Sequence, residues 1–361
     1  MKHKVYAIII TNKCNLKCKY CYSGNLIENK DMDLNTAEKV CKHILEDIEK
    51  NEIQEVQVIF EGNEPLLNFH ILKYIKENLK SNFKNKRIDF TIFTNLQGMN
   101  FEILDYIKKN KIYVHTSLDG NKEIHDSVRG SGTFDKTVFW IKKLSEEKIP
   151  VNASATICYS SLDKFKEILD TYVSLGLKSI NMRYLHNLGL AKMNESSLSY
   201  TPEKFLNFYK NAFDYILYLN SNGKEIMDQK AIFVLNKINH RLDKTNLYSP
   251  PCTGIIKQIL YDPVGDIYTC DEGRNNPSTH KIGNVLSGID EKKQEIFFYN
   301  IKESEKPCIG CKVYEFCGPC LALNSPISVN CIERCLVTKE LFDFISETIK
   351  DEKKANIMEK Y

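Results

Sequence analysis

The fold is decided by the stretch VYAIIITNKCNLKCKYC, residues 5–21. Residues 5–10 form an unbroken apolar run rich in β-branched side chains, which is typical of a strand buried on both faces. Cys14, Cys18 and Cys21 follow at once. In sheets built from strand-helix units, ligand chemistry gathers at the carboxyl ends of the strands. The sequence therefore predicts a thiol-rich site at the end of the first strand.

Five further runs continue this pattern. They are apolar and β-branched and are predicted as strands at 56–60, 88–93, 112–116, 151–157 and 180–184. Amphipathic helical segments fill the gaps; one is predicted to open at Asn35, with Glu38 three residues later, and another at Thr201-Pro202-Glu203. Six strand-helix units predict a right-handed parallel sheet in an α/β fold, either doubly wound or curved into part of a barrel.

Composition excludes several classes of protein. The chain has 361 residues, 42% of them apolar, so it can bury a substantial core and is not expected to be disordered. Fifty lysines and arginines nearly balance 47 aspartates and glutamates without a basic stripe, so no nucleic-acid partner is expected. The apolar run near the start is too short for a signal peptide or a membrane span. We therefore expect a cytoplasmic protein with no membrane partner.

The cysteines divide the chain. Thirteen is unusually many for a cytoplasmic protein, and the odd number argues against a complete disulfide framework. Three lie at 14–21, eight lie at 252–335, and Cys41 and Cys158 stand alone and are predicted to be packed thiols. With Pro250 and Pro251 as a boundary signal, two domains are expected, at 1–245 and 246–361.

The first three thiols fit an iron-sulfur cluster better than a zinc ion. A loop with this spacing can direct three thiolates at one [4Fe-4S] cluster, one ligand fewer than usual, so that one iron stays open. An open iron can chelate the amino acid end of S-adenosylmethionine (SAM), and an electron from the cluster can then release a carbon radical. Structural zinc prefers four ligands, and no histidine follows Cys21 at ligand spacing.

The C-x3-C-x2-C spacing after the first strand resembles the signature of the radical SAM superfamily, whose fold is a partial (β/α)6 barrel. Residues 61–65, EGNEP, are similar to the family's Gly-Gly-Glu-Pro loop, with Asn63 in place of the second glycine. Because asparagine tolerates a left-handed backbone, the loop is expected to keep its shape. The segments TN at 94–95, SLDG at 117–120 and HDSVR at 125–129 also match family positions near the cofactor. The SAM contacts that the resemblance implies are Tyr20, Glu64, Asn95, Ser117, Asp119 and Arg129.

The C-terminal cysteines suggest two further sites. Cys252 and Cys270 bracket a predicted β-hairpin with its turn at 262–265. A C-x2-C-x5-C-x2-C run follows from Cys308 to Cys320. Together with two later cysteines this makes eight thiols, which match two four-ligand sites, and the spacing alone leaves zinc ions and iron-sulfur clusters equally open.

The order of these cysteines is similar to that of the SPASM domain, which implies a small Cys-rich α+β domain with two auxiliary [4Fe-4S] clusters. The implied ligands of the outer cluster are Cys308, Cys311, Cys317 and Cys335. Those of the inner cluster are Cys252, Cys270 and Cys320, completed either by Cys331 or by an iron left open for substrate.

Three functions remain open. The first is a maturase that oxidatively modifies a ribosomally made peptide, by a crosslink or thioether, after hydrogen abstraction by a 5′-deoxyadenosyl radical. The second is an anaerobic sulfatase maturase, which converts Cys or Ser to formylglycine; by that likeness Asp271 would be the catalytic base. Glu61 favours the first, because sulfatase maturases commonly carry Gln there. The third is a metal-stabilised interaction module without chemistry.

The resemblance also implies partners. These are a peptide or protein substrate and an electron donor such as flavodoxin or ferredoxin. Because the sequence opens directly on the first strand, a fused leader-peptide-binding domain is not expected. A separate leader-peptide-binding protein, or a substrate that needs no leader, would take its place. His186, just past the sixth strand, is predicted to be structural.

Overall fold

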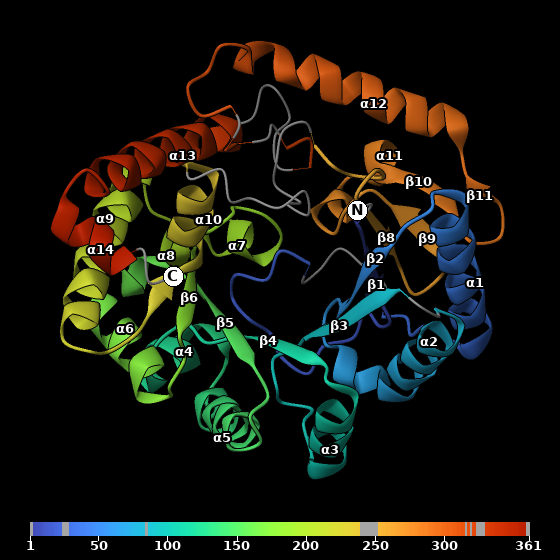
Figure 1. Ribbon diagram of the computed structural model, residues 1–361, viewed down its shortest axis with the longest axis horizontal. Coiled ribbons are helices and arrows are strands. Elements are labelled where there is room, and N and C mark those ends of the chain that lie inside the picture. The colour runs from blue at the N-terminus through green and yellow to red at the C-terminus, as the bar shows by residue number, and fades with distance from the viewer. Residues whose placement is uncertain are drawn as a thin grey trace.

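A computed structural model describes residues 3–23, 29–83, 86–238, 252–314, 316–317, 320–322 and 329–358. Its centre is a curved sheet of eleven described strands in the order β11-β10-β9-β8-β1-β2-β3-β4-β5-β6-β7 (Figure 1). Helices lie on the outside of the arc. The predicted α/β partial barrel is confirmed.

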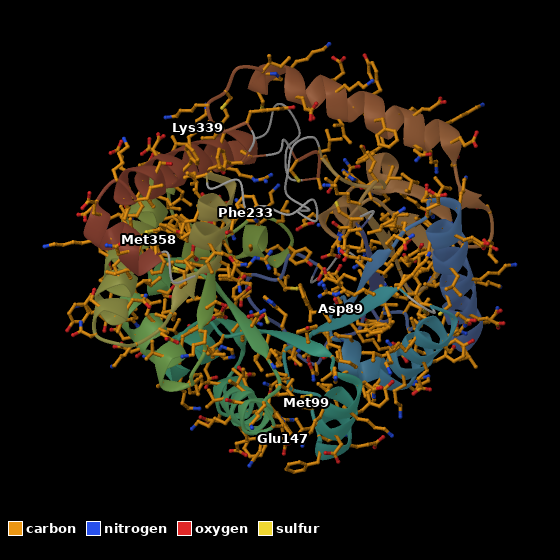
Figure 2. All side chains as sticks on the ribbon, in the orientation of Figure 1. Asp89, Met99, Glu147, Phe233, Lys339 and Met358 are labelled. Atoms are coloured by element: carbon orange, nitrogen blue, oxygen red, sulfur yellow. The ribbon has the colours of Figure 1, made fainter. Side chains whose placement is uncertain are left out.

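The parallel part of the sheet runs from β1 to β7. Its strands are β1 His3–Ile9, β2 Glu55–Glu61, β3 Arg87–Phe93, β4 Tyr113–Ser117, β5 Val151–Thr156, β6 Ser179–Arg183 and β7 Met227–Asp228. The six predicted strands are confirmed to within two residues at each end. On β3 the apolar Ile88, Phe90 and Ile92 are buried, whereas Asp89 alternates with them and lies inside the ring of helices (Figure 2).

The helices pack their apolar faces against this sheet. The longer ones are α1 Leu34–Lys50, α2 Phe69–Asn82, α3 Phe101–Asn110, α4 Lys122–Arg129, α5 Thr133–Glu146, α6 Phe165–Ser174, α9 Pro202–Ser221 and α10 Gln229–Ile238. Single turns are η1 Pro65–Asn68, η2 Tyr159–Ser161, α7 Leu190–Met193 and α8 Glu195–Leu198. Cys41 and Cys158 are 1% and 2% exposed, which confirms both as packed thiols. No helix in the described ranges is both long enough and apolar enough to span a membrane.

Two helix starts test the capping predictions. Thr201 precedes α9 with Pro202 as its first residue, as predicted. The predicted start of α1 at Asn35 is wrong, because the cap is Asp33, whose carboxylate accepts a 2.7 Å hydrogen bond from the Thr36 amide. A carboxylate at this position satisfies an amide that has no partner within the helix, so Asn35 falls in the first turn instead.

The C-terminal segment extends the same sheet. The predicted hairpin is confirmed as β8 Gln258–Tyr261 and β9 Asp266–Tyr268, and β8 pairs in parallel with β1. Gly265 closes the turn at a φ of +81°, where an added Cβ would lie 2.5 Å from Val285 Cγ2. The register places Gln258 beside Val5 and Tyr261 beside Ile8, so the turn of the hairpin lies at the carboxyl end of β1. The division at 245–246 stays a prediction.

The remaining elements first extend the sheet beyond β9 and then cross the open side of the arc to α9 (Figure 1). They are η3 Glu272–Asn275, α11 Pro277–His280, β10 Lys281–Asn284, β11 Gly288–Ile289, α12 Glu291–Glu305, η4 Lys306–Cys308, α13 Val329–Thr348 and α14 Glu352–Met358. The ring of Phe344 on α13 packs edge-on against Phe213 on α9, with centroids 5.7 Å apart. This contact ties the C-terminal segment to the far side of the barrel.

Candidate active site

A cavity of about 650 Å³ lies at the carboxyl ends of the parallel strands. Cys14, Cys18 and Cys21 line it from the loop after β1, and further lining residues come from the ends of β3, β4, β5 and β6. The predicted SAM contacts that line it are Tyr20, Asn95, Ser117 and Arg129. The structure therefore brings the three cysteines and Tyr20, which share one loop, together with three residues from distant segments of the chain.

Glu64 is buried next to the cavity and joins two of its loops. Its carboxylate accepts hydrogen bonds from the Leu66 amide at 3.1 Å, the Thr94 hydroxyl at 2.7 Å and the Asn95 amide at 2.8 Å. Burial raises the pKa of Glu64 to about 7, although the three hydrogen bonds oppose the rise. Glu64 thus holds the loop after β3 against the loop after β2 and sets the position of Asn95.

The loop 61–65 keeps its shape for a reason other than the one predicted. The left-handed conformation falls on Gly62, at a φ of +121°, and not on Asn63. A Cβ on Gly62 would lie 2.6 Å from Ile9 Cγ2, so only glycine fits. The Asn63 side chain donates to the Asn12 carbonyl and accepts from the Ser23 hydroxyl at 2.9 Å. Asn63 therefore ties this loop to the cysteine loop, a connection that glycine could not make.

Two polar side chains approach the thiols. Asn95 Nδ2 lies 3.7 Å from Cys14 Sγ, and Arg129 Nη1 lies 3.9 Å from Cys18 Sγ. Burial raises the pKa of the Cys18 thiol, and the Arg129 guanidinium lowers it. Because donors and positive charge favour a thiolate, both contacts suit sulfur atoms that bind iron.

Asp119 lies behind the cavity wall. It is fully buried and accepts from the Tyr20 hydroxyl at 2.6 Å, from Arg129 Nε at 2.6 Å and from the Thr156 amide at 2.9 Å. The Arg129 guanidinium also lies 5.2 Å from the centroid of the Tyr20 ring. Asp119 therefore orients two residues that line the cavity, and its own contact to SAM stays a prediction.

Sequence reasoning missed several residues that line the cavity. His115 lies two residues before Ser117 on β4, with Nε2 2.9 Å from the Ser154 hydroxyl, and burial lowers its pKa to about 4. Side chains two residues apart on a strand point to the same face, so the predicted position of Ser117 could have indicated His115 as well. Arg183, at the end of β6, and His186 also line the cavity. The position of His186 at the mouth agrees with its place just past the sixth predicted strand, and its structural role stays a prediction.

Asp271 lies in an acidic region beside the cavity. It accepts from the Tyr22 hydroxyl and pairs with Arg274 Nη1 at 3.3 Å. Glu272, the next residue, lines the cavity itself. Burial, reinforced by the charge of Asp271, raises the pKa of both Glu61 and Glu272. Three carboxylates thus share one side of the site, although the sequence drew attention to Asp271 first.

The C-terminal thiols form two groups. Burial raises the pKa of Cys252 and of Cys270, and charge on Cys320 adds to both shifts. These three therefore lie near one another, as the resemblance implied for the inner cluster. The Gly273 amide donates to Cys270 Sγ at 3.3 Å. The side chain of Cys331, the alternative fourth ligand, lies outside the described part of the chain.

The second group lies where η4 and α13 meet. Burial raises the pKa of Cys317, and charges on Cys335 and Cys311 add to this shift. Charges on Cys335, Cys311 and Cys308 raise the pKa of Lys339 on α13. The four thiols that the resemblance implied for the outer cluster therefore share one electrostatic environment.

Comparison with known proteins identifies the family. The model of the radical SAM superfamily matches residues 8–170. The chain belongs to the radical SAM superfamily. An uncharacterized protein of Methanocaldococcus jannaschii is 31% identical, over 63% of this chain and 77% of the relative. A cysteine-type anaerobic sulfatase-maturating enzyme of Clostridium perfringens strain 13 is 24% identical, over 92% of this chain and 93% of the relative. The radical SAM cyclopropyl synthase TigE of Paramaledivibacter caminithermalis is 23% identical, over 88% of this chain and 68% of the relative.

Solved structures show the same fold. The structure of anSMEcpe with bound AdoMet and Cp18Cys peptide superposes with a TM-score of 0.80 at 20% identity, over 98% of this chain and 100% of that chain. The structure of Streptococcus suis SuiB bound to the precursor peptide SuiA superposes with a TM-score of 0.65 at 16% identity, over 89% of this chain and 73% of that chain. The chain is thus a radical SAM enzyme, and membership implies a [4Fe-4S] cluster and SAM as cofactors.

The cysteine loop of this radical SAM protein fits the cluster that the family implies. Cys14, Cys18 and Cys21 line one cavity, and nitrogen atoms of Asn95 and Arg129 approach two of their sulfurs. Each thiolate of a [4Fe-4S] cluster binds a different iron, so three thiols would leave one iron open for SAM.

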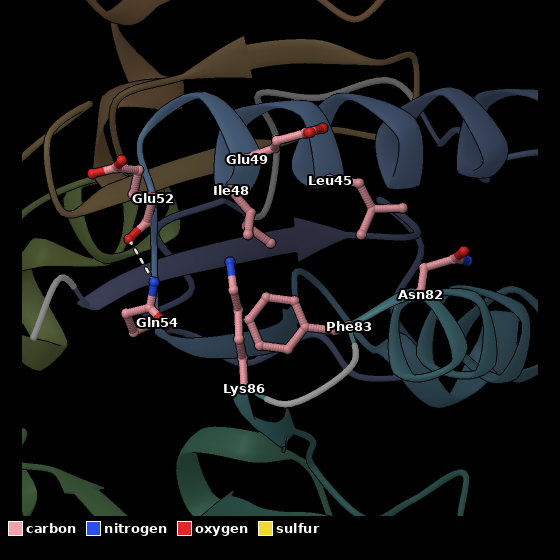
Figure 3. Close-up of a pocket in the computed structure, with 8 residues that line it drawn as sticks. All are labelled: Leu45, Ile48, Glu49, Glu52, Gln54, Asn82, Phe83 and Lys86. Carbon is pink, nitrogen blue, oxygen red and sulfur yellow. Dashed lines mark hydrogen bonds between the residues drawn. The ribbon is translucent and has the colours of Figure 1, made fainter.

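A larger, open groove of about 840 Å³ lies at the opposite end of the sheet (Figure 3). It runs between the end of α1 and the starts of β2 and β3 and is lined by Leu45, Ile48, Glu49, Glu52, Gln54, Asn82, Phe83 and Lys86. No cysteine lines it, and at one side Gln54 donates to the Glu52 carbonyl at 3.1 Å. Chemistry in parallel α/β sheets belongs to the other end, so the cavity beside Cys14 is the candidate active site.

Proposed function

We propose that this radical SAM enzyme is a SPASM-type maturase that oxidatively modifies a ribosomally made peptide by forming a crosslink or a thioether. The observation that carries the proposal is the contact between the cysteine loop and the segment after Cys270: the Tyr22 hydroxyl donates to Asp271, and Arg274 Nη2 donates to Asn12 Oδ1 at 2.8 Å. An enzyme that only cleaved SAM would have no use for the second and third groups of cysteines. We retain 1–245 and 246–361 as its two domains.

Cys14, Cys18 and Cys21 would hold the SAM-binding cluster. With SAM bound, it supplies a 5′-deoxyadenosyl radical that takes a hydrogen atom from the substrate. Asn95 and Arg129 lie beside two of the three sulfurs and would also meet SAM, together with Tyr20 and Ser117. Glu64 and Asp119 are buried and would act by positioning these residues: Glu64 binds the Asn95 amide, and Asp119 binds Arg129.

The C-terminal cysteines would hold the two auxiliary clusters. The outer ligands are Cys308, Cys311, Cys317 and Cys335. The inner ligands are Cys252, Cys270 and Cys320. Such clusters, when bound, can accept an electron from a substrate or bind its thiolate, and both roles favour oxidised products.

Asp271 would take the proton that leaves as the product bond forms. Tyr22 donates to it and Arg274 pairs with it, so the carboxylate is held in place beside Cys270. Exchange of Asp271 for Asn should lower the yield of modified peptide per SAM cleaved by about 100-fold or more. If the yield stays unchanged in Asp271→Asn but falls in Glu272→Gln, the base is Glu272.

The proposal is tested in two steps. The chain is purified anaerobically, its iron and sulfide are counted, and reductive cleavage of SAM to 5′-deoxyadenosine is measured. It is then co-expressed with small peptides encoded beside its gene, and their masses are compared with those from cells lacking the enzyme. Loss of hydrogen from one neighbour supports the proposal, whereas unchanged masses for all of them contradict it.

The second candidate is an anaerobic sulfatase maturase. The position of Asp271, held by Tyr22 and Arg274, favours it, as does the 24% identity over 92% of this chain noted above. Incubation with a synthetic sulfatase peptide that carries the target Cys or Ser separates the two. Formylglycine forms an adduct with hydrazine reagents, whereas a crosslink or thioether does not.

A further inference from the structure

Three cations from separate elements lie around His186, which lines the active-site cavity. Arg183 ends β6, Lys230 lies in the first turn of α10, and Arg334 lies on α13. All three act on one side chain, because burial and then the charges of Arg183, Arg334 and Lys230 lower the pKa of His186 to about 3. Arg183 and His186 both line the cavity. The three side chains are called the cationic cluster below.

The cationic cluster lacks carboxylate partners in the structure. Two buried arginines near the cavity are paired, Arg129 with Asp119 at 2.6 Å and Arg274 with Asp271 at 3.3 Å, whereas Arg183 is exposed and Arg334 is half-buried. Among the described residues, no carboxylate lies within ion-pair distance of Arg183, Lys230 or Arg334. Arg334 Nη1 is buried without any hydrogen-bond partner in that same part of the chain. The Arg334 guanidinium also acts on the Cys317 thiol, which belongs to the second group of cysteines. Burying a guanidinium N–H with no acceptor is costly, so the arrangement points to an acceptor that a bound group supplies, either a cluster or a substrate.

The nearest carboxylates accept hydrogen bonds from groups other than the cationic cluster. Asp228 precedes α10, but its carboxylate accepts from the Tyr209 hydroxyl at 2.6 Å and from the Ala231 amide at 3.1 Å. Glu333 accepts from the Tyr184 hydroxyl at 3.2 Å, which also anchors α13 to the end of β6. Glu272 lines the cavity, but among the described residues it forms no ion pair with Arg183 or Arg334.

We propose that the cationic cluster binds a carboxylate of the substrate peptide, either an Asp or Glu side chain or the C-terminus. The inference rests on the proposed function and names its substrate class as an acidic peptide. Guanidinium groups pair with carboxylates through two parallel hydrogen bonds, which fixes orientation as well as affinity. Since β6 and β1 lie on opposite sides of the arc (Figure 1), a peptide held at β6 would extend across the mouth toward Cys14.

Binding to the reconstituted full chain tests the proposal without turnover. Two synthetic peptide pools share a central cysteine and differ only in carrying Asp or Asn at flanking positions; retention in equilibrium dialysis is read by mass spectrometry. Wild type should retain the Asp pool about tenfold more strongly, as expected for one charge-assisted contact. Arg334→Gln and Arg183→Gln should remove most of this preference. Arg334→Glu should favour a matched Lys pool.

The matched control is Lys224→Gln, on the exposed turn after α9. This variant should keep the wild-type preference, which separates a local contact from overall charge. Iron content checks folding of each variant, and Lys230→Gln replaces any variant that fails to incorporate iron. Equal retention of the Asp and Asn pools by wild type would overturn the inference.

A second arm separates two sources of the carboxylate, because SAM carries one too. If Arg334→Gln weakens SAM binding and leaves the Asp preference unchanged, the ligand is SAM and the inference is wrong. If it removes the Asp preference while SAM binds as in wild type, the inference holds. Failure of the proposed function would appear elsewhere, as a wild-type enzyme that does not cleave SAM under reducing conditions.

Discussion

At the residue scale, two buried carboxylates hold the residues that line the active site. Glu64 and Asp119 are fully buried and bind the residues that line the cavity. A buried carboxylate with no donors would lose ionisation or destabilise the chain, whereas each of these accepts three hydrogen bonds. Their substitution should therefore affect stability as well as SAM binding.

Glu64 should make stability depend on pH. Burial raises its pKa from 4.5 to about 7, so its contribution is fully present below pH 4.5 and is lost as the pH rises through about 7. The change is roughly 3 kcal/mol. Unfolding free energies from denaturant titration at about pH 5 and about pH 8 should differ less in Glu64→Gln than in wild type. An identical difference in both proteins would remove Glu64 as the source.

Asp119 should contribute far more to the free energy of unfolding than a surface carboxylate does. Exchange of Asp119 for Asn leaves the buried Arg129 charge without its partner, and should cost about 3 to 5 kcal/mol of unfolding free energy. The matched control is Asp135→Asn, which breaks an exposed pair with Lys122 and should change stability by no more than about 0.5 kcal/mol. Equal losses in the two variants would contradict a special role for Asp119.

At the scale of elements, α1 shows how local chemistry sets a boundary. Asp33 caps the helix, and Asn35 lies in its first turn. Exchange of Asp33 for Ala should lower the free energy of unfolding by about 1 kcal/mol, because the Thr36 amide loses its acceptor. Asn35→Ala should change it by less than about 0.5 kcal/mol. If thermal or denaturant unfolding showed a larger loss of stability for Asn35→Ala than for Asp33→Ala, Asn35 would be the cap.

At the scale of the whole molecule, the two groups of C-terminal thiols should behave as separate sites. Three four-iron clusters predict about 12 iron atoms per chain. Cys270→Ala and Cys317→Ala should each lower this count to about 8, and the double variant to about 4, because neither group supplies ligands to the other. Iron and sulfide analysis after anaerobic purification measures this. A single variant that lost both auxiliary clusters would show that they assemble together.

What could be predicted from the sequence was local. Strand positions follow from short β-branched apolar runs, which bury themselves wherever the chain places them, and the first cysteine loop follows its strand directly. The membership of the radical SAM superfamily also follows, because its signature lies within one contiguous loop. The start of α1 was missed because Asp33 and Asn35 are equally good caps by residue type.

What only the tertiary structure decided is which distant side chains meet. The sequence offers Asp271 and Glu272 as neighbours, but their backbone conformation turns Glu272 into the cavity. Arg183, Lys230 and Arg334 are ordinary surface residues in the sequence, and they converge because α10 and α13 close against the end of β6. Hydrophobic patterning specifies that a face is buried; it does not specify which charged groups the packed elements then bring together, because that depends on their relative positions in three dimensions.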